Sequence, residues 1–293
     1  MNNTAVKDRL PCNAFSVDVE EYFQVAAFDS CVKRQAWEGF PQRVVQNTRR
    51  ILDLLARHEV RATFFVLGWV AQRHPDLIRA IVAEGHELAS HGMEHVQATR
   101  QGPEFFLADV REARDMLEQT GGVAVRGYRA STYSIGKSNT WAFEKLTEAG
   151  YLYSSSVYPI RHDLYGWPEA PREPFWPSGT SGCGVVEIPV ACLEWGGRRW
   201  PCGGGGFFRL YPYAVTRWAW HRLNQREGRV GVFYCHPWEM DPDQPRIPGL
   251  SFKSRFRHYL NLDRMEVRLD ALLGHFRWGR MDRVFAEVIG QVG

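Results

Sequence analysis

The sequence predicts an α/β fold in which helices surround a parallel sheet that is either open or closed into a barrel. Short segments rich in β-branched and aromatic residues alternate with segments whose apolar residues recur at helical spacing. Several of the helical segments end in glycine, which terminates helices readily. Because crossover helices join the strands in such an alternation, the strands are expected to run parallel.

The first half of the chain carries most of this alternation. The expected strands are 14–20, 61–68, 86–91 and 125–131. The expected helices are 44–58, 74–86, 103–122 and 139–150. The third of these helices begins at Pro103 and is followed by two glycines, which are typical start and stop signals.

The second half is less regular. A stretch rich in proline and aromatic residues, about 158–182, predicts a long loop that wraps the fold. The elements expected after it are strands at 185–191 and 229–238 and a helix at 211–226. From about 252 to 289 we expect one or two amphipathic helices, as a C-terminal extension packed on a single domain that covers residues 1–293.

The composition is that of an ordinary globular protein, with 44% hydrophobic and 24% charged residues. A net charge of +3 is too even to indicate nucleic acid or a membrane surface as partner. The six cysteines form no CxxC pair, so free thiols are expected. The N-terminus lacks the apolar core of a signal peptide. We therefore expect a cytoplasmic protein, with membrane association through a biosynthetic complex as the second expectation.

The first expected strand ends in the acidic sequence Asp18-Val19-Glu20. Buried carboxylates without partners cost several kcal/mol, so these two require something that holds their charge. The period of two along a strand points both side chains to the same side. By the same geometry, Glu21 is expected on the opposite, solvated side.

Histidines stand at two other strand ends. The sequence SHGMEH places His91 and His95 at i and i+4, which on a helical turn brings both imidazoles to one face. His236 closes the last expected strand. Each feature alone has an ordinary explanation, such as a solvated pair, a salt bridge or a core histidine. Together, two histidines and one carboxylate complete a three-ligand zinc site, and a second carboxylate and a third histidine remain as base and acid.

In this order, the motifs DxE, SHxxxH, RxxxxY and a late strand-end histidine resemble those of the carbohydrate esterase family 4 polysaccharide deacetylases. These are the NodB-like metal-dependent N-deacetylases. The sequences FSVDVEEYF, GGGGFFR and HPWEMDPDQPR are most similar to the branch associated with exopolysaccharide loci that carry an exosortase. The motifs span residues 15–246, and the tail resembles that branch's C-terminal extension. The resemblance implies a distorted (β/α) barrel with fewer than eight full units.

The resemblance also implies roles for individual residues. Glu20, His91 and His95 would be the ligands of a divalent metal, with Zn²⁺ the expected ion. Asp18 would be the general base that takes a proton from the attacking water. Arg129 would pair with Asp18 and keep it ionised, since a guanidinium lowers the pKa of a neighbouring carboxyl.

The remaining roles concern the leaving group and the substrate. His236 would be the general acid that protonates the leaving amine, and a backbone N–H near Thr132 would stabilise the oxyanion. The expected substrate contacts are Thr132, Tyr133, Gly205, Trp238 and Arg246. Aromatic rings would stack on sugars, glycine would let the backbone approach one, and arginine would bind an anionic or hydroxyl-rich group. A mobile glycine loop and an ordinary surface arginine are equally good explanations.

Two positions depart from the family pattern. Many members have adjacent aspartates where this chain has Asp18-Val19-Glu20, and the longer glutamate predicts a changed metal distance or preference. Proline usually stands two residues after the arginine, and here that position is Ser131. A less rigid turn is expected there, with weakened or altered activity as a consequence.

The motifs predict a metal-dependent hydrolase that removes N-acetyl groups from the amino sugars of an exopolysaccharide or its lipid-linked precursor and releases acetate. Two alternatives stay open. A hydrolase of a non-sugar amide or cyclic ureide would have a closed pocket rather than an open groove. A non-catalytic carbohydrate-binding relative would lack the metal or occlude the water position. No nucleic-acid partner and no transmembrane segment are expected.

Overall fold

A computed structural model describes residues 10–292, and its centre is a curled parallel sheet of eight strands. The strands are β1 (Cys12–Val19), β2 (Thr63–Val66), β3 (Glu87–Ser90), β4 (Gly127–Tyr128), β5 (Tyr153–Ser154), β6 (Val186–Glu187), β9 (Val232–Cys235) and β10 (Arg277–Gly279). They follow the order β10-β1-β2-β3-β4-β5-β6, and β9 also pairs with β1. The expected α/β fold is therefore confirmed.

The sheet nearly closes on itself. Beyond β6, the amide of Ala191 donates a hydrogen bond of 3.1 Å to the carbonyl oxygen of Val232 in β9. Gly204 forms a parallel bridge to Tyr234 of the same strand. A Cβ atom at Gly204 would lie 1.9 Å from the carbonyl oxygen of Tyr234, and its φ is 123°. Only glycine fits this position, where the chain completes the distorted barrel.

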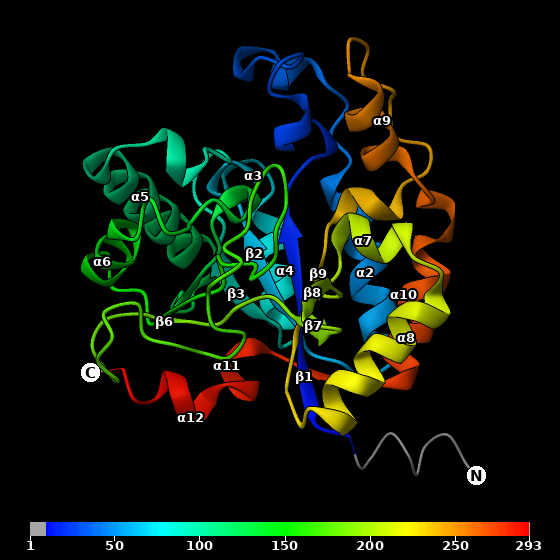
Figure 1. The fold of residues 1–293 in the computed structure, drawn as a ribbon. Helices are drawn as coiled ribbons and strands as arrows, with labels where there is room; N and C mark the ends of the chain where they lie inside the picture. The colour runs from blue at the N-terminus through cyan, green and yellow to red at the C-terminus, as the bar shows by residue number, and fades with distance from the viewer. Residues whose placement is uncertain (1–9, 293) are drawn as a thin grey trace.

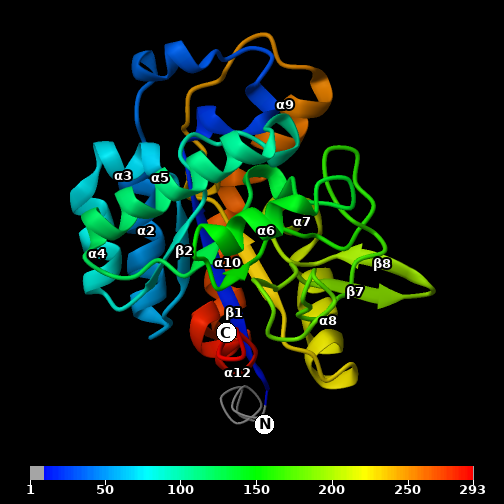
Figure 2. The ribbon, with the colours of Figure 1, turned by 90° about the vertical axis from the view of Figure 1, so that its left-hand side faces the viewer.

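Helices cover the outside of the sheet (Figure 1). They are α2 (Val44–Arg57), α3 (Gly68–Arg73), α4 (Pro75–Ala83), α5 (Pro103–Gly121), α6 (Trp141–Glu148), α7 (Gly205–Leu210), α8 (Tyr213–His221), α9 (Phe252–Tyr259), α10 (Met265–His275), α11 (Met281–Val284) and α12 (Ala286–Ile289). Short helical turns are η1 (Tyr22–Gln24), η2 (Ala26–Phe28), η3 (Arg34–Gly39), η4 (Ala98–Arg100), η5 (Ser131–Tyr133), η6 (Arg222–Arg226), η7 (Pro237–Met240) and η8 (Leu262–Arg264). An antiparallel hairpin of β7 (Cys192–Trp195) and β8 (Arg198–Pro201) projects from one side (Figure 2).

The expected elements of the first half are found, although β4 is only two residues long. The equally short strand β5 follows them and was not expected. The expectation that 252–289 holds helices only is wrong. Three residues of this tail form β10 and pair with Cys12–Ala14 of β1. So short a strand shows no periodicity of its own, and it forms because the edge of β1 offers backbone partners.

The expectation that Glu21 faces solvent is also wrong, because Glu21 is only 1% exposed. The strand ends at Val19 and η1 begins at Tyr22, directly after Glu21, so the alternation of the strand no longer applies at Glu21. The Oε1 atom of Glu21 accepts the amide hydrogens of Arg43 and Val44 at 2.7 and 2.9 Å. Glu21 therefore caps the start of α2 and fastens this helix to the end of β1.

Replacing Glu21 by alanine removes both acceptors and leaves two amides without partners at a buried helix start. We expect Glu21→Ala to lower the free energy of unfolding by about 1–3 kcal/mol, measured by urea denaturation. Glu21→Gln keeps an acceptor oxygen of similar reach and is expected to lose much less. Equal losses in the two variants would contradict the capping role.

Within residues 10–292, no helix is long and apolar enough to cross a membrane. All six cysteines lie in this range and are unpaired, as the sequence predicts. The expectation about a leader concerns the first residues of the chain, and residues 1–9 lie outside the described part.

Candidate active site

A cavity of about 640 Å³ lies where the carboxyl ends of β1, β3 and β9 meet. This is the end of the sheet toward which the arrowhead of β1 points in Figure 1. Parallel strands deliver their terminal side chains to one edge, which is why segments far apart in sequence converge here. The expected site residues that line the cavity are Asp18, Glu20, His91, His95, Thr132, Tyr133, His236 and Trp238.

One carboxylate and two imidazoles form a cluster in this cavity. Glu20, His91 and His95 each offer one ligand atom, and these atoms lie within 4.8 Å of one another. Oε2 of Glu20 is 2.8 Å from Nε2 of His95 and 3.9 Å from Nε2 of His91. Although buried, this oxygen accepts no hydrogen bond from the described residues. An unsatisfied buried carboxylate oxygen between two imidazole nitrogens fits a bound cation.

The protonation states of the cluster also fit a metal. Nδ1 of His91 lies 2.8 Å from the carbonyl oxygen of Arg129, so Nδ1 carries the proton and Nε2 presents its lone pair to the cavity. Burial lowers the pKa of His91 to about 4. Burial alone would raise the pKa of Glu20, but the neighbouring histidines lower it to about 2. A neutral imidazole and an ionised carboxylate are the forms that bind divalent cations.

The expected helical turn between His91 and His95 is absent from the structure. Residues 91–97 form a loop, in which Gly92 has φ 81° and His95 has φ 57°. The two left-handed residues fold the loop back, so the rings converge to centroids 5.4 Å apart. A spacing of four residues therefore brings the imidazoles together through a loop rather than through a helix.

Asp18 is held by a buried arginine. Nη1 of Arg129 donates to Oδ1 of Asp18 at 2.6 Å and to Oγ of Ser16 at 2.8 Å. Both side chains are almost completely buried, with exposures of 0% and 2% for Arg129 and Asp18. The other oxygen, Oδ2, lies 3.5 Å from the hydroxyl of Tyr133 and 4.0 Å from Nε2 of His236. One oxygen of Asp18 is thus anchored, and the second faces the reaction space.

His236 is supported from behind by Glu239, which follows it by three residues in the HPWE motif. Oε2 of Glu239 lies 3.1 Å from Nδ1 of His236 and accepts the backbone N–H of the same residue at 2.9 Å. Burial alone would lower the pKa of His236, but the carboxylates of Glu239, Glu20 and Asp18 raise it to about 9. His236 is therefore an imidazolium near neutral pH, with Nε2 directed at Asp18 and Glu20.

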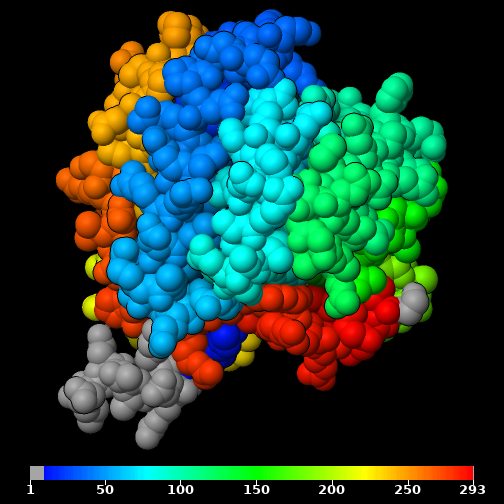
Figure 3. All heavy atoms as spheres, turned by 180° about the vertical axis from the view of Figure 1, so that it is seen from behind, coloured from blue at the N-terminus to red at the C-terminus, as the bar shows by residue number. Residues whose placement is uncertain are grey.

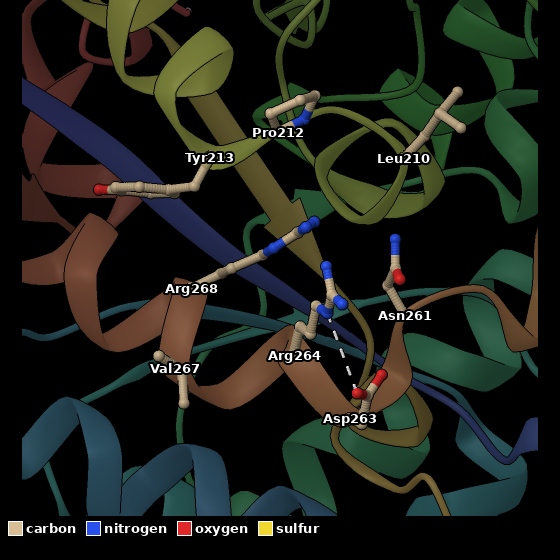
Figure 4. Close-up of a pocket in the computed structure, with 8 residues that line it drawn as sticks. All are labelled: Leu210, Pro212, Tyr213, Asn261, Asp263, Arg264, Val267 and Arg268. Carbon is tan, nitrogen blue, oxygen red and sulfur yellow. Dashed lines mark ion pairs between the residues drawn. The ribbon is translucent and has the colours of Figure 1, made fainter.

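Arg209 completes this support. Its Nε donates to Oε1 of Glu239 at 2.6 Å, and its Nη1 donates to the carbonyl oxygen of His258 at 2.9 Å. From the outside, Asn261 and Arg268 donate to the carbonyl oxygen of Arg209 at 2.8 and 2.7 Å. Figure 4 shows these two side chains in a separate surface hollow of about 550 Å³. Arg209 ends the glycine-rich motif, but nothing in the sequence around it indicates that its partner is a carboxylate 30 residues further on.

Replacing Glu239 by glutamine removes the charge that stabilises the imidazolium of His236. We expect Glu239→Gln to move the alkaline limb of the pH–rate profile to lower pH by about one unit, because the pKa of His236 falls. The measurement is kcat/KM as a function of pH for both proteins with the same metal loaded. An unchanged alkaline limb would contradict the role of Glu239.

Thr132 and Tyr133 occupy a strained turn at the cavity. Their φ angles are 57° and 50°, unusual values for residues with a Cβ atom. The amide of Thr132 has no hydrogen-bond acceptor among the described residues, so it is available to a ligand. Ser131 stands where the family has proline, and the strained turn forms without that ring.

Three other expected contacts are placed differently from the prediction. The ring of Trp238 stacks with the imidazoles of His236 and His258 and is 6% exposed, so it has little free face for a sugar. Its Nε1 instead donates to Oε1 of Glu20 at 3.1 Å. Gly205 packs under Tyr234, and its neighbour Gly206 lines the cavity.

Arg246 lies outside the cavity lining, although the prediction assigns it a substrate contact. Its guanidinium carbon stands 4.1 Å from the ring centroid of Tyr259. The side chain of Arg246 therefore packs on the end of α9 instead of reaching the substrate space.

Two family models match consecutive segments of the chain. A model of the polysaccharide deacetylase family matches residues 26–154. This match assigns residues 26–154 to a polysaccharide deacetylase domain. A second model, a domain of unknown function called DUF3473, matches residues 155–286. The sheet extends beyond this first matched segment, since β9 and β10 pair with β1.

Named relatives match part of the chain. A chitooligosaccharide deacetylase of Sinorhizobium fredii is 32% identical over 126 residues, which are 43% of this chain and 53% of that protein. A peptidoglycan-N-acetylglucosamine deacetylase of Bacillus cereus is 29% identical over the same shares. The chain thus matches about half the length of these curated relatives. A candidate polysaccharide deacetylase of Mycobacterium smegmatis has the same fold, with TM-score 0.61, 19% identity and coverage of 96% and 90% of the two chains.

Proposed function

We propose that this chain hydrolyses the N-acetyl groups of amino sugars in a polysaccharide and releases acetate. One observation carries the proposal: a held carboxylate, an imidazolium and a carboxylate–histidine cluster face one another across a single cavity. Amide hydrolysis needs a base for water, stabilisation of the oxyanion and an acid for the poor leaving group. The residues around this cavity offer each of these.

Glu20, His91 and His95 would hold a divalent metal, for which we propose zinc because catalytic zinc sites use such imidazole and carboxylate donors. When bound, the ion supplies Lewis acidity to the water and to the amide carbonyl. Nε1 of Trp238 donates to the second oxygen of Glu20, which orients the carboxylate toward the two imidazoles.

Asp18 takes a proton from the water through Oδ2, while Arg129 holds Oδ1 in place through a hydrogen bond. The water oxygen forms a bond to the acetyl carbon, and the amide of Thr132 donates to the carbonyl oxygen as negative charge develops there. His236 gives its Nε2 proton to the nitrogen as the carbon–nitrogen bond breaks. The products are acetate and the free amine of the sugar.

The segment matched by the domain of unknown function supplies part of this machinery, and Asp18 and Glu20 precede both matched segments. His236, Glu239 and Arg209 all lie in residues 155–286, whereas His91, His95 and Arg129 lie in residues 26–154. We therefore propose that both segments form one catalytic unit rather than an enzyme with an accessory domain.

For the substrate we propose N-acetylglucosamine units of an exopolysaccharide or its lipid-linked precursor. The names of the two relatives support N-acetylated glucosamine polymers, and the similarity of the motifs to the exosortase-locus branch supports exopolysaccharide. The cavity volume of about 640 Å³ accommodates more than one sugar ring.

The test is acetate release from N-acetylglucosamine oligomers and from a bacterial exopolysaccharide, with zinc added and with a chelator. We expect the protein to release acetate, the chelator to abolish this release, and added zinc to restore it. Release from a small non-sugar amide alone would replace the polysaccharide with another amide substrate. A protein that binds no metal and releases no acetate would contradict the enzymatic proposal and favour a carbohydrate-binding relative.

A further inference from the structure

Two segments form a rim at the mouth of the catalytic cavity. One is the loop 161–165 and the other is α9, and residues of both line the cavity. Asp163 of the loop binds Lys253 and Arg257 of α9 at 2.5 and 3.0 Å, which joins the two segments. None of these side chains has a part in the hydrolysis described above.

Large apolar side chains of the rim stand in solvent. Phe252 is 85% exposed, Phe256 48% and Leu164 57%. The two phenylalanines lie one helical turn apart on α9, with ring centroids separated by 6.5 Å. On the other face of α9, His258 is buried against Phe28, with centroids 4.5 Å apart. One face of α9 therefore packs on the protein, and the face that carries Phe252 and Phe256 is exposed to solvent.

Positive charge surrounds these apolar groups. Among the described residues, no carboxylate pairs with the guanidinium of Arg161 or with that of Arg255. Lys253 and Arg257 share the single carboxylate of Asp163. The rim thus carries an excess of cations, although the chain as a whole has a net charge of only +3.

We propose that this rim docks on the surface of an anionic lipid bilayer, with Phe252 and Phe256 among the headgroups. Exposed aromatic and aliphatic groups next to lysine and arginine are the combination that binds such interfaces. The helix α9 lies near the upper end of the molecule in Figure 1, and the orange segment lies at the same end when the molecule is seen from behind (Figure 3). Docking there brings the cavity mouth to the membrane, where a lipid-linked glycan would be presented.

A soluble acidic glycan would match the charges equally well, but it would not match the apolar groups. A leucine offers no flat face to a sugar ring, and Phe252 is not among the residues that line the cavity. Insertion at a bilayer interface instead removes all three apolar side chains from water. The geometry therefore favours a lipid surface over an acidic polymer.

The test compares the full chain with the variant F252S/R255Q in sedimentation with vesicles. Neither residue lines the cavity, so acetate release from a water-soluble oligomer should stay unchanged. The matched control is F105S/R49Q, since Phe105 is 79% exposed on α5 and Arg49 is exposed on α2, away from the rim. Vesicles of phosphatidylcholine mixed with phosphatidylglycerol are compared with vesicles of phosphatidylcholine alone.

We expect the wild-type chain and F105S/R49Q to bind the anionic vesicles alike and the neutral vesicles much more weakly. The affinity of F252S/R255Q for the anionic vesicles should be lower than that of the wild-type chain by a factor of about ten or more. The proposal is overturned if the wild-type chain does not bind anionic vesicles, or if the two double variants bind them equally well. It is also overturned if the wild-type chain binds the acidic polymer polygalacturonate but binds no vesicle. Because the readout is vesicle binding, it stands apart from the outcome of the acetate assay.

Discussion

Asp18→Asn is expected to lower kcat about a thousandfold while leaving the bound metal in place. The substitution keeps the shape of the side chain and removes its capacity to take a proton from water, a function worth about 10²–10⁴ in rate. Asp18 is not part of the Glu20, His91 and His95 cluster, so metal content should remain near that of the wild-type protein.

The assay measures acetate release and metal content on the same preparations of protein. Glu20→Gln serves as the comparison, because it removes a ligand charge and should lose metal and activity together. If Asp18→Asn retained activity within tenfold of wild type, another group would have to be the base. If it lost its metal, Asp18 would be a ligand, and the division of roles proposed above would fail.

Arg129→Met is expected to destabilise the protein by about 3–5 kcal/mol, the second large effect. Removing one partner of a buried ion pair leaves the other charge without compensation. Arg129 is completely buried, and besides Asp18 it binds the carbonyl oxygen of Ser155 and the hydroxyl of Ser16. A methionine fills part of the volume but offers none of these donors.

The double variant Asp18→Asn/Arg129→Met separates charge from packing. With the buried carboxylate neutralised, we expect it to be more stable than Arg129→Met alone, because the unpaired charge is gone. Urea denaturation in chelator, for both single variants and the double variant, gives the coupling free energy. A coupling close to zero would show that packing of Arg129, rather than its pairing with Asp18, determines the loss.

The sequence predicts well those features that repeat or alternate. The strand–helix alternation indicates the fold, and the polar strand ends indicate the cavity, since parallel strands must deliver those ends to one edge. The pairing of Asp18 with Arg129 and the cluster of Glu20, His91 and His95 in space match what the motifs imply. These features depend on local pattern and on the geometry common to all parallel sheets.

Features that depend on distant partners could not be predicted in the same way. Glu21 caps a helix that begins 23 residues further on, and nothing in the sequence around it indicates this partner. Glu239 and Arg209 are 30 residues apart, and only the folded chain shows that one holds the other. Trp238 is a residue type that often stacks on sugars, which is why the sequence indicated a substrate contact. In the structure its ring stacks on two histidines instead.

The position of β1 also constrains how this chain can be assembled. Its backbone pairs on one side with β2, which follows closely in sequence, and on the other with β9 and β10. The Ser16 hydroxyl donates to the carbonyl of Phe233 across 217 residues. During synthesis, β1 therefore leaves the ribosome long before β9 and β10 have been made, and until then one edge of β1 stays unpaired. Loops of this length make folding slow, so the nascent chain needs protection from aggregation until its last quarter has emerged.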